Sequence, residues 1–129
     1  PLLVVDGAHT PESARKMREA LEKYFSFDKA VLIIGSSSDK DIAGIVNELA
    51  PIFEKAVITR SVHPRSMPAN TIVQEFRNRG VNTTVVEDFL EALPLALSLA
   101  GENDLVCATG SLFIVAGVIE VAEKLGISK

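Results

Sequence analysis

Four side chains in the sequence are of types that bind nucleotides or carboxylates, and each follows a short apolar run. The Asp6 carboxylate could accept hydrogen bonds from ribose hydroxyls, and the His9 ring could donate to a phosphate oxygen or pack against a sugar. Lys40 could add a positive point charge. Ser111 opens an expected helix directly after Gly110, so its hydroxyl and the first backbone N–H groups could hold a carboxylate or a phosphate. Together these residue types point to a site for a nucleotide and a carboxylate.

Each of these residues also has an ordinary structural role open to it. A glycine after a strand commonly serves a turn. Asp6 and His9 could cap a helix locally, and the serines at positions 36–38 could form a solvated loop. Lys40 and Arg65 could be surface charges. The functional interpretation therefore depends on where the chain places these residues relative to one another.

The elements that must position them are predicted from five short apolar runs, rich in valine and isoleucine. Runs that are mostly continuous rather than alternating predict strands buried on both faces of a sheet. The predicted strands are Leu2–Val5, Ala30–Ile34, Ala56–Thr59, Thr83–Val86 and Leu105–Ala108. Their alternation with amphipathic stretches predicts one α/β domain with a mainly parallel sheet.

Five amphipathic stretches between and after these runs predict helices. Thr10 and Pro11 supply an N-cap and a proline at the first helical position. Asp39 is the predicted cap of the second helix, and Asp88 begins the fourth, where Pro94 implies either a kink or a later start. The residues predicted to face inward are, helix by helix, Ala14, Met17, Leu21 and Tyr24; Ile42, Ile45, Val46 and Leu49; Ile72, Val73 and Phe76; Phe89, Leu90, Leu93 and Leu97; and Leu112, Val115, Ala116, Ile119, Ala122 and Leu125.

One edge of the predicted sheet concentrates the residues that could do chemistry. In parallel sheets, ligands bind beyond the carboxyl ends of the strands, near the point where the strand order reverses. Both histidines, His9 and His63, follow predicted strand ends, whereas the opposite edge carries plain turn residues such as 26–29 and 101–104. This asymmetry predicts that the carboxyl edge is the functional surface.

The overall composition excludes several classes of protein. A chain of 129 residues fits one compact domain, and a net charge of -4 provides no basic field for nucleic acid or an anionic membrane. The single cysteine, Cys107, excludes an internal disulfide framework and suits a reducing compartment, so we expect a cytoplasmic protein. No apolar run approaches the ~20 residues that span a bilayer. The opening segment, residues 1–6, is expected to be a strand of a longer polypeptide.

Several familiar catalytic motifs are absent from the sequence. There is no G-x-x-x-x-G-K-[ST] phosphate loop, no G-x-G-x-x-G after the first strand and no G-x-S-x-G nucleophile elbow. No cluster of cysteines and histidines predicts zinc. We therefore expect neither catalytic residues nor metal ligands in this chain.

Four short motifs resemble, in order and spacing, the C-terminal domain of folylpolyglutamate synthases and dihydrofolate synthases, which belong to the Mur ligase superfamily. Residues 4–11 resemble the D-G-A-H-N-P signature that opens that domain. Residues 39–41 are similar to its D-K-D after the second strand, and residues 63–66 to its P-R-[AS] after the third. Residues 110–116 are similar to its G-S-[LF]-[YF]-x-[VA]-[AG]. The resemblance covers essentially the whole chain.

The resemblance implies a fold and a second domain that this chain lacks. The fold would be a three-layer α/β/α Rossmann-like domain with a parallel sheet of about five strands in the order 1-5-2-3-4. A sixth, antiparallel strand of the family's sheet would precede this chain. The phosphate loop and the Mg²⁺ ligands would belong to an N-terminal ATPase domain that this chain lacks, so the chain alone would be inactive.

The resemblance also implies an activity and roles for individual residues. The full enzymes use ATP to join L-glutamate to a folate, to dihydropteroate or to a growing γ-glutamyl tail. The acceptor carboxyl is phosphorylated, and the glutamate amine then attacks the acyl phosphate. Asp6 would contact the ATP ribose and His9 the nucleotide near its phosphates. Lys40 and Ser111 would lie near the glutamate carboxylates, and Arg65 would line the same cleft.

Three alternatives stay open at this stage. Thr10 stands where the folate enzymes usually have asparagine, whereas peptidoglycan Mur ligases, the UDP-MurNAc-peptide synthetases, often have threonine. A non-catalytic nucleotide-binding or flavodoxin-like module is the second alternative, although a receiver domain would need an aspartate where residues 59–61 stand. An interaction domain that has lost catalysis is the third.

Overall fold

Ten regular elements and one short 3₁₀ helix alternate along the described chain. The computed structural model describes residues 1–60 and 64–126, so His63 and Ser61 lie outside the described residues, as do the side chains of Leu112 and Phe113. The strands are β1 (Leu2–Val5), β2 (Ala30–Gly35), β3 (Lys55–Ile58), β4 (Asn82–Val85) and β5 (Leu105–Gly110). The helices are α1 (Pro11–Tyr24), α2 (Ile42–Leu49), α3 (Ala69–Arg77), η1 (Phe89–Glu91), α4 (Ala92–Leu99) and α5 (Leu112–Lys124).

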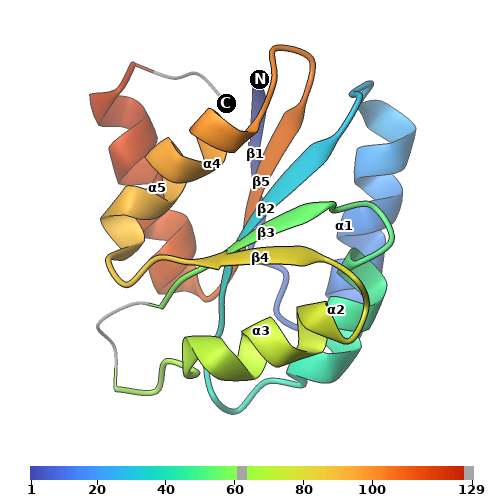
Figure 1. The fold of residues 1–129 in the computed structure, drawn as a ribbon, viewed down its shortest axis with the longest axis vertical. Helices are drawn as coiled ribbons and strands as arrows, with labels where there is room; N and C mark the ends of the chain where they lie inside the picture. Colours follow the sequence, from blue (N-terminus) through green and yellow to red (C-terminus); the bar gives the residue numbers. More distant parts are fainter. Residues whose placement is uncertain (61–63, 127–129) are drawn as a thin grey trace.

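The five strands form one parallel sheet in the order β1-β5-β2-β3-β4, as the family resemblance implied. The last strand, β5, lies between β1 and β2, so the chain crosses back over β2 and β3 to reach its place (Figure 1). The strand order therefore reverses around β5. In sheets of this kind, that reversal opens a crevice beyond the carboxyl ends of the strands.

Helices cover both faces of the sheet and make three layers (Figure 1). One core lies between the sheet and α1, α2 and α3, and includes Leu32, Ile34 and Ile58. The other lies between the sheet and α4 and α5, and includes Val31 and Ile33. Successive residues of β2 thus point to opposite cores, which is why that strand reads as a continuous apolar run.

The prediction that every strand is buried on both faces is wrong for β4. Three of its four residues are exposed, because β4 is an edge strand with β3 on one side only. The β-branched residues Thr83 and Thr84 suit an edge as well as a central strand. An apolar or β-branched run in the sequence therefore does not reveal its place in the sheet.

Parts of the predicted helix faces are also wrong. In α5 the buried residues recur every fourth position, at Ile114, Val118 and Ala122, whereas Ala116, predicted to face inward, is exposed. Gly117 is also buried, and a Cβ built there would lie 2.3 Å from the Phe89 ring, so glycine permits the close approach of η1 to α5. Three more residues predicted to face inward, Tyr24, Leu90 and Leu125, are exposed.

Pro94 could either kink the fourth predicted helix or lie near a later start of that helix. The structure shows the later start. Asp88 caps η1, its carboxylate accepting from the Leu90 backbone N–H at 2.9 Å. Regular α-helix begins only at Ala92, so Pro94 falls in the first turn of α4. A proline there removes a backbone donor that has no partner within the helix anyway.

The described helices include none with the length and apolar character needed to cross a membrane.

Cys107 is expected to be chemically inert in the folded chain. Its side chain is fully buried in β5, with Sγ 3.7 Å from the Met17 sulfur. Burial raises the pKa of the Cys107 thiol far above its usual value, and the negative charge of Asp6 adds to the rise. We expect no labelling by iodoacetamide at pH 8 in buffer and rapid labelling in denaturing urea, measured by intact mass. Labelling at equal rates in both conditions would contradict this burial.

Candidate functional site at the carboxyl edge of the sheet

The segment after β1 is anchored to β5 by two hydrogen bonds. The Asp6 backbone N–H donates to the Ala108 carbonyl at 3.0 Å, which extends the β1–β5 pairing by one residue. The buried Thr109 hydroxyl donates to the Ala8 carbonyl at 3.4 Å. The side chains of Asp6 and His9 are exposed on the outer side of this segment. The backbone is thus held in place while both side chains remain available to a ligand.

The His9 ring is held by a contact within its own loop. Its Nδ1 lies 3.0 Å from the Gly7 carbonyl oxygen. Because a carbonyl only accepts hydrogen bonds, Nδ1 can serve as the donor in this contact, and Nε2 faces no protein partner among the described residues. His9 is therefore oriented by its own loop before any ligand arrives.

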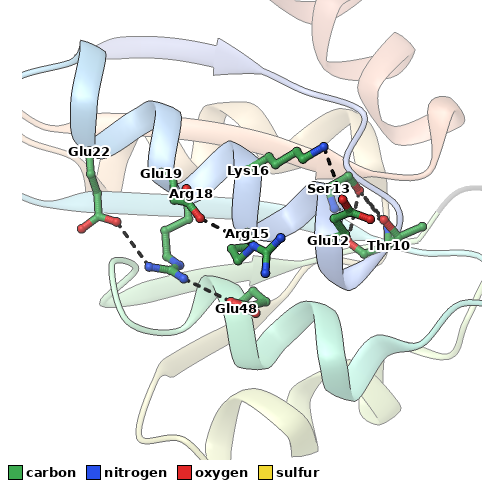
Figure 2. A network of polar contacts seen from close by, with 9 residues as sticks. All are labelled: Thr10, Glu12, Ser13, Arg15, Lys16, Arg18, Glu19, Glu22 and Glu48. Carbon is green, nitrogen blue, oxygen red and sulfur yellow. Dashed lines mark hydrogen bonds and ion pairs between the residues drawn. The ribbon is translucent and has the colours of Figure 1, made fainter.

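A capping box fixes the start of α1 directly after His9 (Figure 2). The Thr10 hydroxyl accepts from the Ser13 N–H at 3.0 Å, and the Ser13 hydroxyl accepts from the Thr10 N–H at 2.9 Å. The Ser13 hydroxyl also accepts from the His9 N–H at 3.0 Å. Reciprocal contacts of this kind satisfy backbone donors that a helix start would otherwise leave unpaired. They confirm the predicted cap at Thr10 and hold the His9 backbone.

The starts of α1 and α2 lie against each other. A Cβ built on Gly44 would lie 2.6 Å from Pro11 Cγ, so glycine permits this approach. Further along the two helices, Arg18 pairs with Glu22 of α1 at 3.4 Å and with Glu48 of α2 at 3.1 Å (Figure 2). The packing of α1 on α2 thus brings the segment around His9 close to the segment that precedes α2.

Lys40 lies just before α2 and is partly exposed. Its Nζ is 3.9 Å from the Asp39 carboxylate, and its side chain is 32% exposed. The cap of α2 is Asp41, whose carboxylate accepts from the Gly44 N–H at 3.0 Å. The predicted cap at Asp39 is therefore wrong. Asp41 immediately precedes the first helical residue, and only from that position does the short side chain reach the third helical N–H.

Removing this cap is expected to destabilise the chain. Asp41→Ala should lower the free energy of unfolding by about 1 kcal/mol, because it leaves a helical N–H unpaired and removes a negative charge from the helix start. Asp39→Ala is the matched control and should change stability by less than about 0.5 kcal/mol, because its weak pairing with Lys40 is exposed. Urea unfolding followed by circular dichroism would measure both. A larger loss for Asp39→Ala would contradict the assignment of the cap.

Arg65 is brought to this edge by a link between two loops. Ser37 and Ser66 form an antiparallel bridge between the segments that follow β2 and β3. The Ser38 N–H donates to the Arg65 carbonyl at 2.7 Å, and the Met67 N–H donates to the Ser36 carbonyl at 2.7 Å. Arg65 is exposed, and its backbone is tied to the serine segment that leads to Lys40. The structure therefore places Arg65 on the same edge as the other predicted site residues.

Ser111 caps α5 at the reversal of strand order. Its hydroxyl accepts from the Ile114 N–H at 3.3 Å, and its own N–H donates to the Gly35 carbonyl at 2.8 Å. Gly110, with φ +110°, allows this close turn, because a Cβ there would lie 1.7 Å from the Gly35 oxygen. The hydroxyl oxygen of Ser111 accepts a hydrogen bond from the start of α5, so the hydroxyl can still donate its hydrogen to a ligand.

All five predicted site residues thus lie on the carboxyl edge, on three helix starts or on the loops linked to them. Among the described residues, no hydrogen bond or ion pair joins the side chains of Asp6, His9, Lys40 and Ser111 to one another. The sequence analysis did not identify Thr109 as a residue that organises the site. A polar residue at the end of an apolar strand could have indicated it. Thr59, whose fully buried hydroxyl has no hydrogen-bond partner in the described structure, was also missed. Residues 1–60 and 64–126 contain no group of three or more His, Cys, Asp or Glu that could hold a metal ion.

Sequence comparisons connect this geometry to known ligases. The family described as Mur ligase, glutamate ligase domain, matches residues 1–112. The dihydrofolate synthase/folylpolyglutamate synthase of Mycobacterium tuberculosis is 28% identical over 106 residues, which cover 79% of this chain and 21% of the relative. The UDP-N-acetylmuramoyl-L-alanyl-D-glutamate–2,6-diaminopimelate ligase of Caldanaerobacter subterraneus is 32% identical over 113 residues, which cover 82% of this chain and 23% of the relative.

Solved structures agree with the sequence comparison. A bifunctional folylpolyglutamate synthase/dihydrofolate synthase with Mn, AMPPNP and L-glutamate bound has a TM-score of 0.83 and 28% identity, over 98% of this chain and 29% of the solved chain. This chain therefore spans between a fifth and a third of the length of the proteins it resembles. The family match over residues 1–112 and the structural likeness over 98% of the chain agree. The chain belongs to the Mur ligase, glutamate ligase domain family.

Proposed function

We propose that this chain is the C-terminal domain of an ATP-dependent ligase of the folylpolyglutamate synthase/dihydrofolate synthase type. The observation that carries the proposal is the gathering of three capped helix starts, those of α1, α2 and α5, at the carboxyl edge around β5. Support comes from a relative named for this activity and from a solved neighbour with AMPPNP and L-glutamate bound. The domain contributes to the binding of ATP and of glutamate, whereas the acceptor would be a folate or dihydropteroate.

The electrostatics of three helix starts favour anionic ligands. The positive end of a helix dipole and its unpaired N–H groups attract phosphates and carboxylates. In this proposal Asp6 accepts from the ribose and His9 contacts the nucleotide near its phosphates. Lys40 and Ser111 contact the glutamate carboxylates, and Arg65 lines the cleft. The ligands of the proposed reaction are all anions, which suits an edge where these groups converge.

The domain would contribute to the reaction by positioning. Holding the glutamate amine beside an acyl phosphate replaces a random encounter with a defined geometry, and closure of the domain excludes water that would hydrolyse the intermediate. The proposal assigns Mg²⁺ mainly to an N-terminal ATPase domain. That domain is the main protein partner, and the chain without it turns over no ATP.

Lys40→Ala in the full-length ligase tests the proposed roles. We expect the KM for glutamate to rise about tenfold or more, because a charged hydrogen bond to a carboxylate is lost, while the KM for ATP stays unchanged. Lys29→Ala, which removes the same charge from an exposed position at the opposite edge of the sheet, is the control and should leave both constants unchanged. Steady-state ligation assays with varied glutamate and ATP would measure the effect. An increase in the KM for ATP alone would contradict the assignment of Lys40 to glutamate.

A peptidoglycan Mur ligase is the second candidate function. Thr10 matches the residue common in those enzymes, and the 2,6-diaminopimelate ligase relative is 32% identical. The acceptor separates the two candidates. The full-length enzyme should ligate glutamate to dihydropteroate or a folate in the first case. In the second it should ligate an amino acid to a UDP-N-acetylmuramoyl peptide.

A further inference from the structure

A groove lies between α3 and the edge strand β4, apart from the residues described above. Its volume is about 380 Å³. The lining residues are Arg60, Pro68, Ala69, Asn70, Val73, Arg77, Val85 and Glu87. Because β4 and β1 are at opposite edges of the sheet, the groove shares no residue with the segment around Asp6 and His9. One end nevertheless opens at the carboxyl edge, since Arg60 and Glu87 follow β3 and β4.

Two arginines in this groove have no partner among residues 1–60 and 64–126. Arg60 and Arg77 are exposed, and neither has an ion pair or a side-chain hydrogen bond among the described residues. By contrast, the guanidinium groups of Arg15, Arg18 and Arg79 are each paired with a glutamate. Glu87 is the only acidic residue that lines the groove. An anionic ligand could therefore bind without displacing an existing ion pair.

The lining alternates charge with apolar surface. Asn70, Val73 and Arg77 recur at three- and four-residue spacing on one face of α3, so Arg77 lies about 10 Å along the helix from Asn70. Arg60 lies at the other end, beside the start of α3. The apolar part of the lining includes Pro68 and Ala69 at the start of α3 and Val85, which is 44% exposed at the sheet edge. The groove thus combines two guanidinium groups with exposed apolar surface.

We propose that this groove binds the γ-glutamyl tail of the acceptor. In a γ-linked chain, two methylene groups lie within the backbone between successive carboxylates. Such a chain can set carboxylates against Arg60 and Arg77 while its methylenes cover Pro68 and Val85, which are exposed. In an ordinary α-linked acidic peptide the carboxylates stand at the ends of flexible side chains instead of directly on the backbone. The groove therefore fits the γ-linked tail better.

This inference rests on the proposed function, because only a folylpolyglutamate-type ligase meets such a tail. It adds a second binding region, for the part of the tail that precedes the reacting terminal carboxyl. Each arginine is exposed, so solvent screens its pairing and the contribution of each contact is modest. The expected behaviour is affinity that grows with tail length and weakens as salt is added.

Binding can be measured on the 129-residue chain itself with three probes. The first is γ-linked tri-L-glutamate, the second is the same chain with its carboxylates amidated, and the third is α-linked tri-L-glutamate. We expect the first to shift the NMR amide signals of Asn70, Val73 and Val85, the second to leave them unchanged and the third to bind more weakly. Equal binding of the amidated chain would overturn the role of the arginines. Equal binding of the α-linked peptide would overturn the assignment to a γ-glutamyl tail.

The double variant Arg60→Gln with Arg77→Gln provides a second test of the groove. It should weaken γ-linked triglutamate binding by about three- to tenfold, since two solvent-screened charge pairs are lost. Arg15→Gln removes the same charge from α1 and should leave the affinity unchanged. Unchanged affinity in the double variant, with the fold intact by circular dichroism, would overturn the proposal. If AMPPNP still shifts the Asp6–His9 signals while triglutamate binds nowhere, only the groove assignment fails and the proposed function stands.

Discussion

Gly110→Ala is expected to lower the free energy of unfolding by about 4 kcal/mol. The φ of Gly110 is +110°, a conformation that costs an L-residue with a side chain. A Cβ there would also lie 1.7 Å from the Gly35 oxygen and 2.8 Å from the Gly35 carbonyl carbon. Both obstacles are backbone atoms at the ends of β5 and β2, so no side-chain rotation relieves the overlap. The strands must separate, and the hydrogen bond from Ser111 to Gly35 is lost with them.

Gly80→Ala is the control for this substitution. Gly80 has φ +76°, and a Cβ there meets nothing within 4 Å. Alanine at this position should therefore cost only the conformational strain, about 1–2 kcal/mol. Urea unfolding of both variants would give the difference between them, which isolates the overlap with Gly35. Equal losses for the two variants would contradict the close approach of β2 and β5.

Leu32→Ala is expected to cost about 3–4 kcal/mol. Leu32 is 0% exposed in β2, which lies between β5 and β3. Truncation removes the apolar contacts of its side chain and leaves a cavity that a sheet held on both sides cannot close. Small domains unfold with a free energy of about 5–15 kcal/mol, so the variant should keep only a small free energy of unfolding.

The matched control is the same substitution at an exposed leucine. Leu90 in η1 is 44% exposed, so Leu90→Ala should cost less than about 1 kcal/mol. Thermal and urea unfolding would compare the two variants at equal concentration. If Leu90→Ala lowered the free energy of unfolding as much as Leu32→Ala, the result would contradict the burial of Leu32 in the core.

The sequence was sufficient to locate the strands, because a strand buried on both faces leaves a continuous apolar run. Ala30–Ile34 and Leu105–Ala108 are such runs, and both lie within central strands. The strand order came instead from the family resemblance, since pairing between distant segments leaves no local pattern. That order places β4 at the sheet edge, whereas the local pattern of the run alone predicted that β4 would be buried.

The predicted site residues were located by a simple rule, that ligands bind beyond the carboxyl ends of parallel strands. The contacts that organise the edge could not be predicted. Asp39 and Asp41 are chemically equal, and the path of the backbone at Lys40 decides which one caps α2. The bridge between Ser37 and Ser66 and the bond from Thr109 to Ala8 both depend on the folded arrangement of distant segments.

The central claim is that the carboxyl edge binds the nucleotide and glutamate, and an NMR titration of the isotope-labelled chain tests it most directly. AMPPNP is expected to shift the amide signals of residues 6–10, and L-glutamate those of Lys40 and Ser111. The opposite edge, residues 26–29 and 101–104, should stay unchanged and serves as the internal control. Shifts confined to that opposite edge, with residues 6–10, 40 and 111 unmoved by either ligand, would contradict the account.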